Sequence, residues 1–236
     1  MTGRDTHAQD AAAREQAILA AWHANALPWT QAVRGGAIAS RRLVTDAAVV
    51  QAVIDWRPRS VIDLGCGEGW LVRALAAEGI AALGVDAVPA LVHSAAAATG
   101  GRFVTAEYAA IAAGALGERA DAVICNFSLL GEASVDRLLQ AMPALLEPSG
   151  VVIIQTLHPC SAGGEHAYVD GWRDGSWAGC GEGFNAPAPW YFRTLAGWLA
   201  CFAAAGLRLL ELREPLHPHS GQPASVIFVL GQAQPA

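Results

Sequence analysis

The chain has 236 residues, and its 21 acidic side chains outnumber the 15 basic ones, all arginine, for a formal net charge of −6. Nucleic acid is therefore not expected as a partner, because non-specific binding of a phosphate backbone depends on clustered Lys and Arg. Hydrophobic residues make up 53% of the chain, yet no charge-free run reaches the length of a bilayer span, so no membrane partner is expected. The polar first residues lack the apolar core of a secretory signal, and we expect a cytoplasmic protein.

The length of the chain fits one α/β domain with an elaborated end, present as a monomer or homodimer. The five cysteines are odd in number and widely spaced, which is typical of reduced thiols. Neither the set Cys160, His166 and Cys180 nor the pair His217 and His219 has the paired spacing of a zinc site. No metal site is therefore predicted.

The amino-terminal part of the chain is predicted to be helical. Apolar residues at helical spacing predict a helix over 11–22, and a second helix, capped by Thr45 or Asp46, should run to about residue 54. Between them the first helix should be broken by three residues: Asn25, Pro28 and Trp29. We treat residues 1–57 as an N-terminal helical cap.

The stretch VIDLGCGEG, from Val61 to Gly69, forms the turn around which the rest of the chain is organised. Its first residues are apolar and β-prone and predict a buried strand, whereas the apolar residues after Gly69 recur at helical spacing. Gly65, Gly67 and Gly69 leave no Cβ in the turn, so a ligand can lie against the main chain. The sequence therefore predicts a small-molecule site between a strand and the start of a helix.

The spacing of these glycines favours one class of ligand. A dinucleotide fingerprint counted from Gly65 needs glycine at position 70, where the chain has Trp70, and this disfavours a NAD-type oxidoreductase. Asp63, two residues before the first glycine, would repel a pyrophosphate and suits a ligand with a positive group. The stretch resembles the first motif of class I S-adenosylmethionine (SAM) dependent methyltransferases. The alternative is a glycine turn that serves only close packing of strand and helix.

The resemblance extends over about residues 59–230 and implies a fold and a reaction. The implied α/β fold is three-layered and Rossmann-like, with a seven-stranded, mostly parallel sheet, an antiparallel closing strand and helices on both faces. The methyltransferase domain, residues 58–236, would transfer a methyl group from SAM by in-line displacement and leave S-adenosylhomocysteine (SAH). A small-molecule acceptor is expected. A tRNA or protein acceptor and a non-catalytic SAM-binding protein are the alternatives.

The later strands add expected cofactor contacts. A second strand should end at Asp86, 23 residues after Asp63, which is about the length that two adjacent parallel strands and their connecting helix require. The resemblance implies that Asp86 binds the ribose, that the segment after a third strand (103–105) holds the adenine, and that the end of a fourth strand (121–127) lies beside the methionine part. A register shifted by one residue would place Ala106 in the adenine segment. The expected contacts are Asp63, Gly65, Cys66, Gly67, Asp86, Ala87, Glu107, Tyr108, Asn126 and Phe127.

The carboxyl-terminal part should complete the sheet and cover the site. Pro143 should kink or restart the helix after the fourth strand, and the apolar run 151–154 predicts a central strand. Residues 158–192 are rich in aromatic residues and glycine and have little periodicity, which predicts an aromatic substrate lid; the alternative is a loop that folds onto a neighbouring subunit. Thr194 should cap the next helix. Two antiparallel strands should follow, at 207–212 and 225–230.

Methyl transfer from SAM requires positioning of the acceptor, exclusion of water and, where the nucleophile carries a proton, a base. His158, just after the fifth strand, is the first candidate for that base and Tyr191 the second, with a structural role as the alternative for His158. In similar methyltransferases the amino-terminal helices cover the ligand, so aromatic and arginine side chains of the cap and lid are candidates for substrate contact. The alternative is an added helical layer with solvated arginines. The candidates are Trp29, Arg34, Arg42, Trp172 and Trp190.

Overall fold

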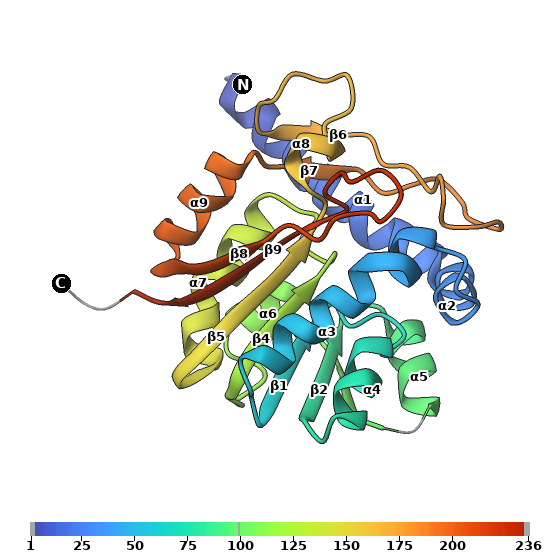
Figure 1. The fold of residues 1–236 in the computed structure, drawn as a ribbon. Coiled ribbons are helices and arrows are strands. Elements are labelled where there is room, and N and C mark those ends of the chain that lie inside the picture. Colours follow the sequence, from blue (N-terminus) through green and yellow to red (C-terminus); the bar gives the residue numbers. More distant parts are fainter. Residues whose placement is uncertain (1–2, 99, 234–236) are drawn as a thin grey trace.

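A computed structural model describes residues 3–98 and 100–233 and shows one large twisted sheet with helices on both faces (Figure 1). The strand order is β3-β2-β1-β4-β5-β9-β8. β1 to β5 are mutually parallel, whereas β9 is antiparallel to both β5 and β8. The predicted seven-stranded, mostly parallel sheet with an antiparallel closing strand is confirmed. Its strands are β1 (Ser60–Leu64), β2 (Ala81–Asp86), β3 (Arg102–Thr105), β4 (Ala120–Asn126), β5 (Leu146–Thr156), β8 (Leu207–Arg213) and β9 (Val226–Gln232).

Two hydrophobic layers sandwich the central strands, because successive side chains of a strand point to opposite faces. Val61 of β1 packs in one layer with two helices, α3 (Asp46–Asp55) and α4 (Trp70–Ala77). Its neighbour Ile62 packs in the other layer with α6 (Tyr108–Ala112), α7 (Ala133–Leu145) and α9 (Leu195–Ala204). α5 (Pro89–Ala97) lies against β2 and β3 at the edge of the sheet. The three-layer prediction is therefore confirmed.

The amino-terminal helices differ from the prediction in where they break. α1 (Gly3–Ala24) ends at Asn25, whose buried side chain donates from Nδ2 to the Ala21 carbonyl (2.8 Å). Pro28 and Trp29 do not break a helix, because they lie in the first turns of α2 (Ala26–Arg34). The first N–H groups of an α-helix have no partner within that helix, so a proline at this position costs no helical hydrogen bond. Thr45 and Asp46 do not cap α3, since a short π-helix, η1 (Arg41–Thr45), runs directly into it.

α1 is tied to the sheet domain through the start of α7. The Oε1 atom of Glu15 accepts hydrogen bonds from the backbone N–H groups of Glu132 (2.8 Å) and Ser134 (3.2 Å), and its Oε2 accepts one from the Ser134 hydroxyl (2.6 Å). The N-cap residue Glu132 makes no capping bond of its own. A carboxylate from the first helix of the chain therefore satisfies donors at the amino end of α7.

Pro143 does not interrupt α7, which continues to Leu145. The predicted restart does not occur, because only two residues follow Pro143 and the missing N–H affects only the last turn of the helix. A kink at Pro143 stays a prediction.

Residues 158–192 contain regular structure that the sequence does not predict. A short helix, α8 (Pro159–Ala162), precedes two antiparallel strands, β6 (Gly171–Arg173) and β7 (Trp190–Phe192). This small hairpin lies beside α1, beyond the end of β5 (Figure 1). The predicted cap of α9 is confirmed, because the Thr194 hydroxyl accepts from the N–H of Gly197 (2.9 Å). Within residues 3–98 and 100–233, no helix has the length and apolarity needed to cross a bilayer.

Candidate cofactor and acceptor site

A cavity of about 790 Å³ opens at the carboxyl ends of four neighbouring strands. Residues at the carboxyl ends of these strands line it: Asp63, Asp86, Asn126 and Thr156. All ten residues expected to contact the cofactor line this one cavity. This placement follows from the parallel order of the strands, because parallel strands present their carboxyl ends at the same edge of the sheet.

The glycine turn forms the floor of the cavity. Gly65 and Gly67 have φ angles of 77° and 58°, in the region that favours glycine. A Cβ on Gly65 would collide with the side chain of Ser128, which is fixed by a hydrogen bond from its hydroxyl to the Leu64 carbonyl (2.7 Å). A Cβ on Gly67 would lie 3.3 Å from Nε1 of Trp29. The turn is thus flanked by side chains from the segment after β4 and from α2, which leave little room for a Cβ.

Two carboxylates face the turn from adjacent strand ends. Asp63 is 1% exposed, and its Oδ1 atom has no hydrogen-bond partner among the described residues. Burial and the nearby charge of Asp86 raise the pKa of Asp63 to about 7. Asp86 is better satisfied, since its two oxygens accept from the N–H groups of Gly67 (2.8 Å) and Val88 (2.9 Å). Asp63 therefore presents an unpaired acceptor that a cationic group would satisfy.

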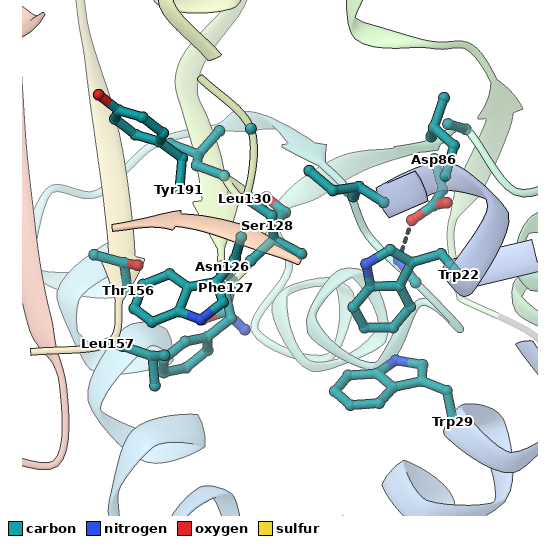
Figure 2. A pocket seen from close by; sticks show the side chains of 18 of the residues that line it. Trp22, Trp29, Asp86, Asn126, Phe127, Ser128, Leu130, Thr156, Leu157 and Tyr191 are labelled. Carbon is teal, nitrogen blue, oxygen red and sulfur yellow. Dashed lines mark hydrogen bonds between the residues drawn. The ribbon is translucent and has the colours of Figure 1, made fainter. Parts of the chain in front are cut away.

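A third polar group comes from the end of β4. Asn126 has a buried side-chain oxygen without a partner among the described residues. The next residue, Phe127, has a φ of 53°, an uncommon conformation for a non-glycine residue that is held by a hydrogen bond from its N–H to the Gln155 carbonyl (2.8 Å). Figure 2 shows both side chains at the same wall of the cavity, with Ser128 and Leu130 beside them and Trp22, Trp29 and Asp86 across the open space.

The π-helix η1 supplies two site residues that the sequence analysis missed. The guanidinium of Arg41 lies over the Trp70 ring (4.7 Å to the centroid) and donates from Nε to Asp46 (3.0 Å). Its Nη2 atom and the hydroxyl of the buried Thr45 are both without partners among the described residues, and both residues line the cavity. π-Helical turns frequently occur at functional sites.

Aromatic side chains from the cap and the lid close one side of the cavity. Trp22 of α1 packs edge to face against Trp29 (5.0 Å between centroids) and Trp177 (5.4 Å), and Trp177 stacks on Phe184 (4.6 Å). The backbone N–H of Asn185 donates to Oδ1 of Asn25 (2.7 Å). Segments about 150 residues apart in the chain thus meet over the cavity, and the three tryptophans line it.

The structure does not bring all predicted substrate residues to this cavity. Trp29 and Trp190 line it. Arg34 instead pairs with Glu68 (2.7 Å), Arg42 donates to the Gly36 carbonyl (3.2 Å) on the surface, and Trp172 donates to Glu132 (3.2 Å). The last three residues are held in other contacts and are absent from the cavity wall.

His158 does not point into the cavity, although Leu157 and Pro159 on either side of it line the wall. Its ring is 3% exposed, with Nε2 2.8 Å from Oε1 of Glu214, and Nδ1 accepts from the N–H of Cys160 (3.2 Å). Both ring nitrogens are therefore occupied. The direction of the side chain argues against His158 as the base and for the structural alternative.

Replacing His158 by Asn is expected to lower the free energy of unfolding by about 1 to 3 kcal/mol, because buried polar partners are left unpaired. SAH affinity should stay within about twofold, since a change smaller than 0.5 kcal/mol is expected at a residue outside the cavity. Urea denaturation and calorimetry measure the two quantities. The exposed His93 gives the matched control, His93→Asn, which should change neither. A large loss of SAH affinity with unchanged stability would contradict the structural role.

Tyr191 lines the cavity (Figure 2), and its backbone N–H donates to the Leu130 carbonyl (2.7 Å). Burial and the neighbouring Glu132 carboxylate raise the pKa of the Tyr191 phenol to about 12. The phenol therefore stays protonated at neutral pH, which suits a hydrogen-bond donor and argues against a general base. Among the residues that the structure describes, no group of three or more His, Cys, Asp or Glu side chains is arranged to hold a metal ion.

Comparison with known proteins agrees with this geometry. A family profile described as a methyltransferase domain matches residues 34–212. The CcbJ methyltransferase from Streptomyces caelestis has a similar structure, with a TM-score of 0.57 and 21% identity over 80% of this chain and 88% of that one. So do a putative SAM-dependent methyltransferase from Listeria monocytogenes (0.61, 17%, 79% and 97%) and the SAH-bound magnesium protoporphyrin IX methyltransferase from Synechocystis (0.55, 19%, 80% and 81%).

The curated protein sequences contain no match to this chain. The three solved structures named above are each below 25% identity and share the fold, and the family profile extends over more than half of the 236 residues. Members of this family take their methyl group from SAM. The cavity, with its glycine turn and its two carboxylates, lies within the matched region, and the chain is thus a member of the class I SAM-dependent methyltransferases.

Proposed function

We propose that this cavity binds SAM across the tip of β1, with the amino acid end of the cofactor between Asp63 and η1. The observation that carries the proposal is a set of unpaired polar atoms of opposite character: Oδ1 of Asp63 accepts, whereas Nη2 of Arg41 and the Thr45 hydroxyl can donate. Arg41 is close enough to Asp63 for its charge to oppose, in part, the rise in the pKa of Asp63 that burial causes. The two side chains nevertheless form no ion pair. An ammonium and a carboxylate on one carbon would satisfy both sides.

The remaining cofactor contacts follow from the positions of the strand ends. Asp86 would accept from the ribose hydroxyls, and Glu107 and Tyr108 would border the adenine, with Trp22 and Val88 on the side of the cap. Asn126 and Phe127 would lie beside the sulfur. SAM supplies a methyl group on a positively charged sulfur, which leaves as a neutral thioether when a nucleophile attacks. The chain itself therefore has to orient the acceptor and exclude water.

We infer that the acceptor is a small, largely apolar molecule. On the side of Phe127 away from Asp86 the cavity wall is largely apolar, and Leu130, Thr156, Leu157 and Tyr191 lie there (Figure 2). A backbone hydrogen bond from the N–H of Tyr191 to the Leu130 carbonyl (2.7 Å) joins β7 to the segment after β4 at this wall. Aromatic walls bury flat apolar molecules well, and Thr156 offers a polar contact.

The test is binding followed by turnover. Calorimetry with SAM and SAH should give saturable binding, and SAM labelled in its methyl group should then transfer label to members of a panel of small aromatic amines, phenols and thiols. Transfer to bulk tRNA or to a peptide library, with none to the panel, would overturn the small-molecule acceptor. Tight binding of SAM without transfer to any of the three would favour the non-catalytic alternative. The absence of SAM and SAH binding would overturn the proposed cofactor site.

A further inference from the structure

A buried carboxylate inside the glycine turn is held by two arginines from different elements. The side chain of Glu68 is 0% exposed. Nε of Arg34 donates to its Oε2 atom (2.7 Å), and Nη2 of Arg73 donates to both of its oxygens (2.7 Å each). An unpaired carboxylate in this position would be costly, so Glu68 requires at least one of the two cations.

The two arginines differ in what they connect. Arg73 lies five residues after Glu68 in α4 and also donates from Nη1 to the Glu68 carbonyl (2.7 Å), so it neutralises the carboxylate locally. Arg34 is the last residue of α2, and it reaches Glu68 across the fold while donating from Nη2 to the Ser94 carbonyl of α5 (2.8 Å). Of the two arginines, it is Arg34 that joins the cap to the glycine turn and α5.

α2 carries two other contacts that depend on its position. Trp29 lies over the glycine turn, with Nε1 3.3 Å from the place of a Cβ on Gly67, and it lines the cavity. Asn25, which precedes α2, accepts a hydrogen bond from the backbone of Asn185 in the lid (2.7 Å). One end of α2 is thus linked to the turn and the other to the lid.

We propose that Arg34 is a positioning residue for the cofactor and acts through Glu68. Arg34 does not line the cavity, and its role is to hold α2 where Trp29 covers the glycine turn and Asn25 meets the lid. This inference rests on the proposed cofactor site. We call the cap closed when α2 holds Trp29 over the glycine turn. The apparent dissociation constant of the cofactor is the intrinsic constant divided by the fraction of molecules with a closed cap, so it rises as that fraction falls. Arg34 therefore sets cofactor affinity without a contact to it.

The variant Arg34→Gln should raise the Kd of SAH about tenfold, if the closed cap falls to about a tenth of the molecules. Most of the change should appear as faster dissociation in stopped-flow experiments. Arg34→Lys keeps the charge and should recover part of the affinity. The matched control is Arg42→Gln, because Arg42 belongs to the same cap, is exposed and donates only to the Gly36 carbonyl. Wild-type affinity in Arg34→Gln would overturn the proposal.

A double-mutant cycle distinguishes action through Glu68 from a direct effect. In a Glu68→Gln background, the further change Arg34→Gln should alter the SAH Kd by less than twofold, because the bond that it removes is already weakened. Equal effects of Arg34→Gln in both backgrounds would contradict the role of Glu68.

Hydrogen exchange of the ligand-free protein supplies a readout that does not need the cofactor. Arg34→Gln should speed exchange of the amides in α2 and in residues 174–189 of the lid, while amides of β1 and β4 stay as protected as in the wild type. Unchanged exchange in α2 would overturn the proposal even if SAH did not bind the wild type. Failure of SAH binding in the wild type, together with faster exchange in the variant, would refute the cofactor site and leave the positional role of Arg34 supported.

Discussion

Replacement of Asp63 by Asn is expected to abolish most SAH binding and at the same time to stabilise the ligand-free protein. The side chain keeps its size and loses the charge that would pair with the ammonium of the ligand. Removing one member of a buried charge pair costs about 3 kcal/mol, which corresponds to a rise of roughly 100-fold in the Kd. Calorimetry with SAH measures this loss. The control ligand 5′-methylthioadenosine, which lacks the amino acid, should bind the variant and the wild type alike.

The stability gain has a defined pH dependence. The pKa of Asp63 rises from 3.8 to about 7 on folding, so between these values the folded protein binds a proton that the unfolded chain has released. The wild type should therefore lose stability as the pH rises from 4 to 7, and Asp63→Asn should lack this loss. SAH affinity of the wild type should rise about tenfold between pH 6 and pH 8, because the ionised carboxylate is the form that binds a cation.

Thermal unfolding of both proteins at pH 5 and pH 8 tests the sign. The difference in melting temperature should favour the variant at pH 8 and should be clearly smaller at pH 5, where only part of the loss of stability has occurred. Asp10→Asn, at an exposed position of α1, is the control and should show neither effect. A variant that unfolds at a lower temperature than the wild type at pH 8 would contradict an unpaired buried carboxylate.

Arg41→Gln is expected to raise the Kd of SAH about 30-fold, or about 2 kcal/mol, through loss of the cation that would meet the carboxylate of the ligand. The adjacent variant Arg42→Gln should leave the Kd unchanged, because the Arg42 side chain turns to the Gly36 carbonyl. As for Asp63, the affinity for 5′-methylthioadenosine should not change. Equal losses for SAH and for this shorter ligand would show that Arg41 acts on the nucleoside or on the fold.

The contrast between Arg41 and Arg42 shows where sequence analysis stops. Adjacent residues of an α-helix point about 100° apart, and a π-helical turn changes that angle. Whether Arg41 or Arg42 faces the cavity therefore depends on where the π-helical turn begins, which the hydrophobic pattern of the sequence does not reveal. The same holds for His158, which leaves β5 between two residues that line the wall. By contrast, the first strand, the glycine turn after it and the position of Asp86 at the end of β2 are set by local spacing and by parallel pairing, and these positions are confirmed.

The lid illustrates a second kind of failure. β6 and β7 pair across 16 intervening residues, each with only three residues, so neither is long enough to show an alternating pattern. Their pairing depends on anchors elsewhere, such as the Asp170 carboxylate, which accepts from both the N–H and the hydroxyl of Thr194 (2.8 Å each). The pairing of β6 and β7 is therefore set by contacts between distant segments, and local sequence patterns do not reveal such contacts.

The contact between Glu15 and the start of α7 has a consequence for how this protein can be divided. A fragment that began at residue 58, the edge suggested by the glycine motif, would keep every strand of the sheet and still lose the carboxylate that caps a helix in the hydrophobic layer. Removal of residues 1–57 would thus be expected to destabilise the sheet domain that remains. The first helix is therefore better kept as part of the folding unit.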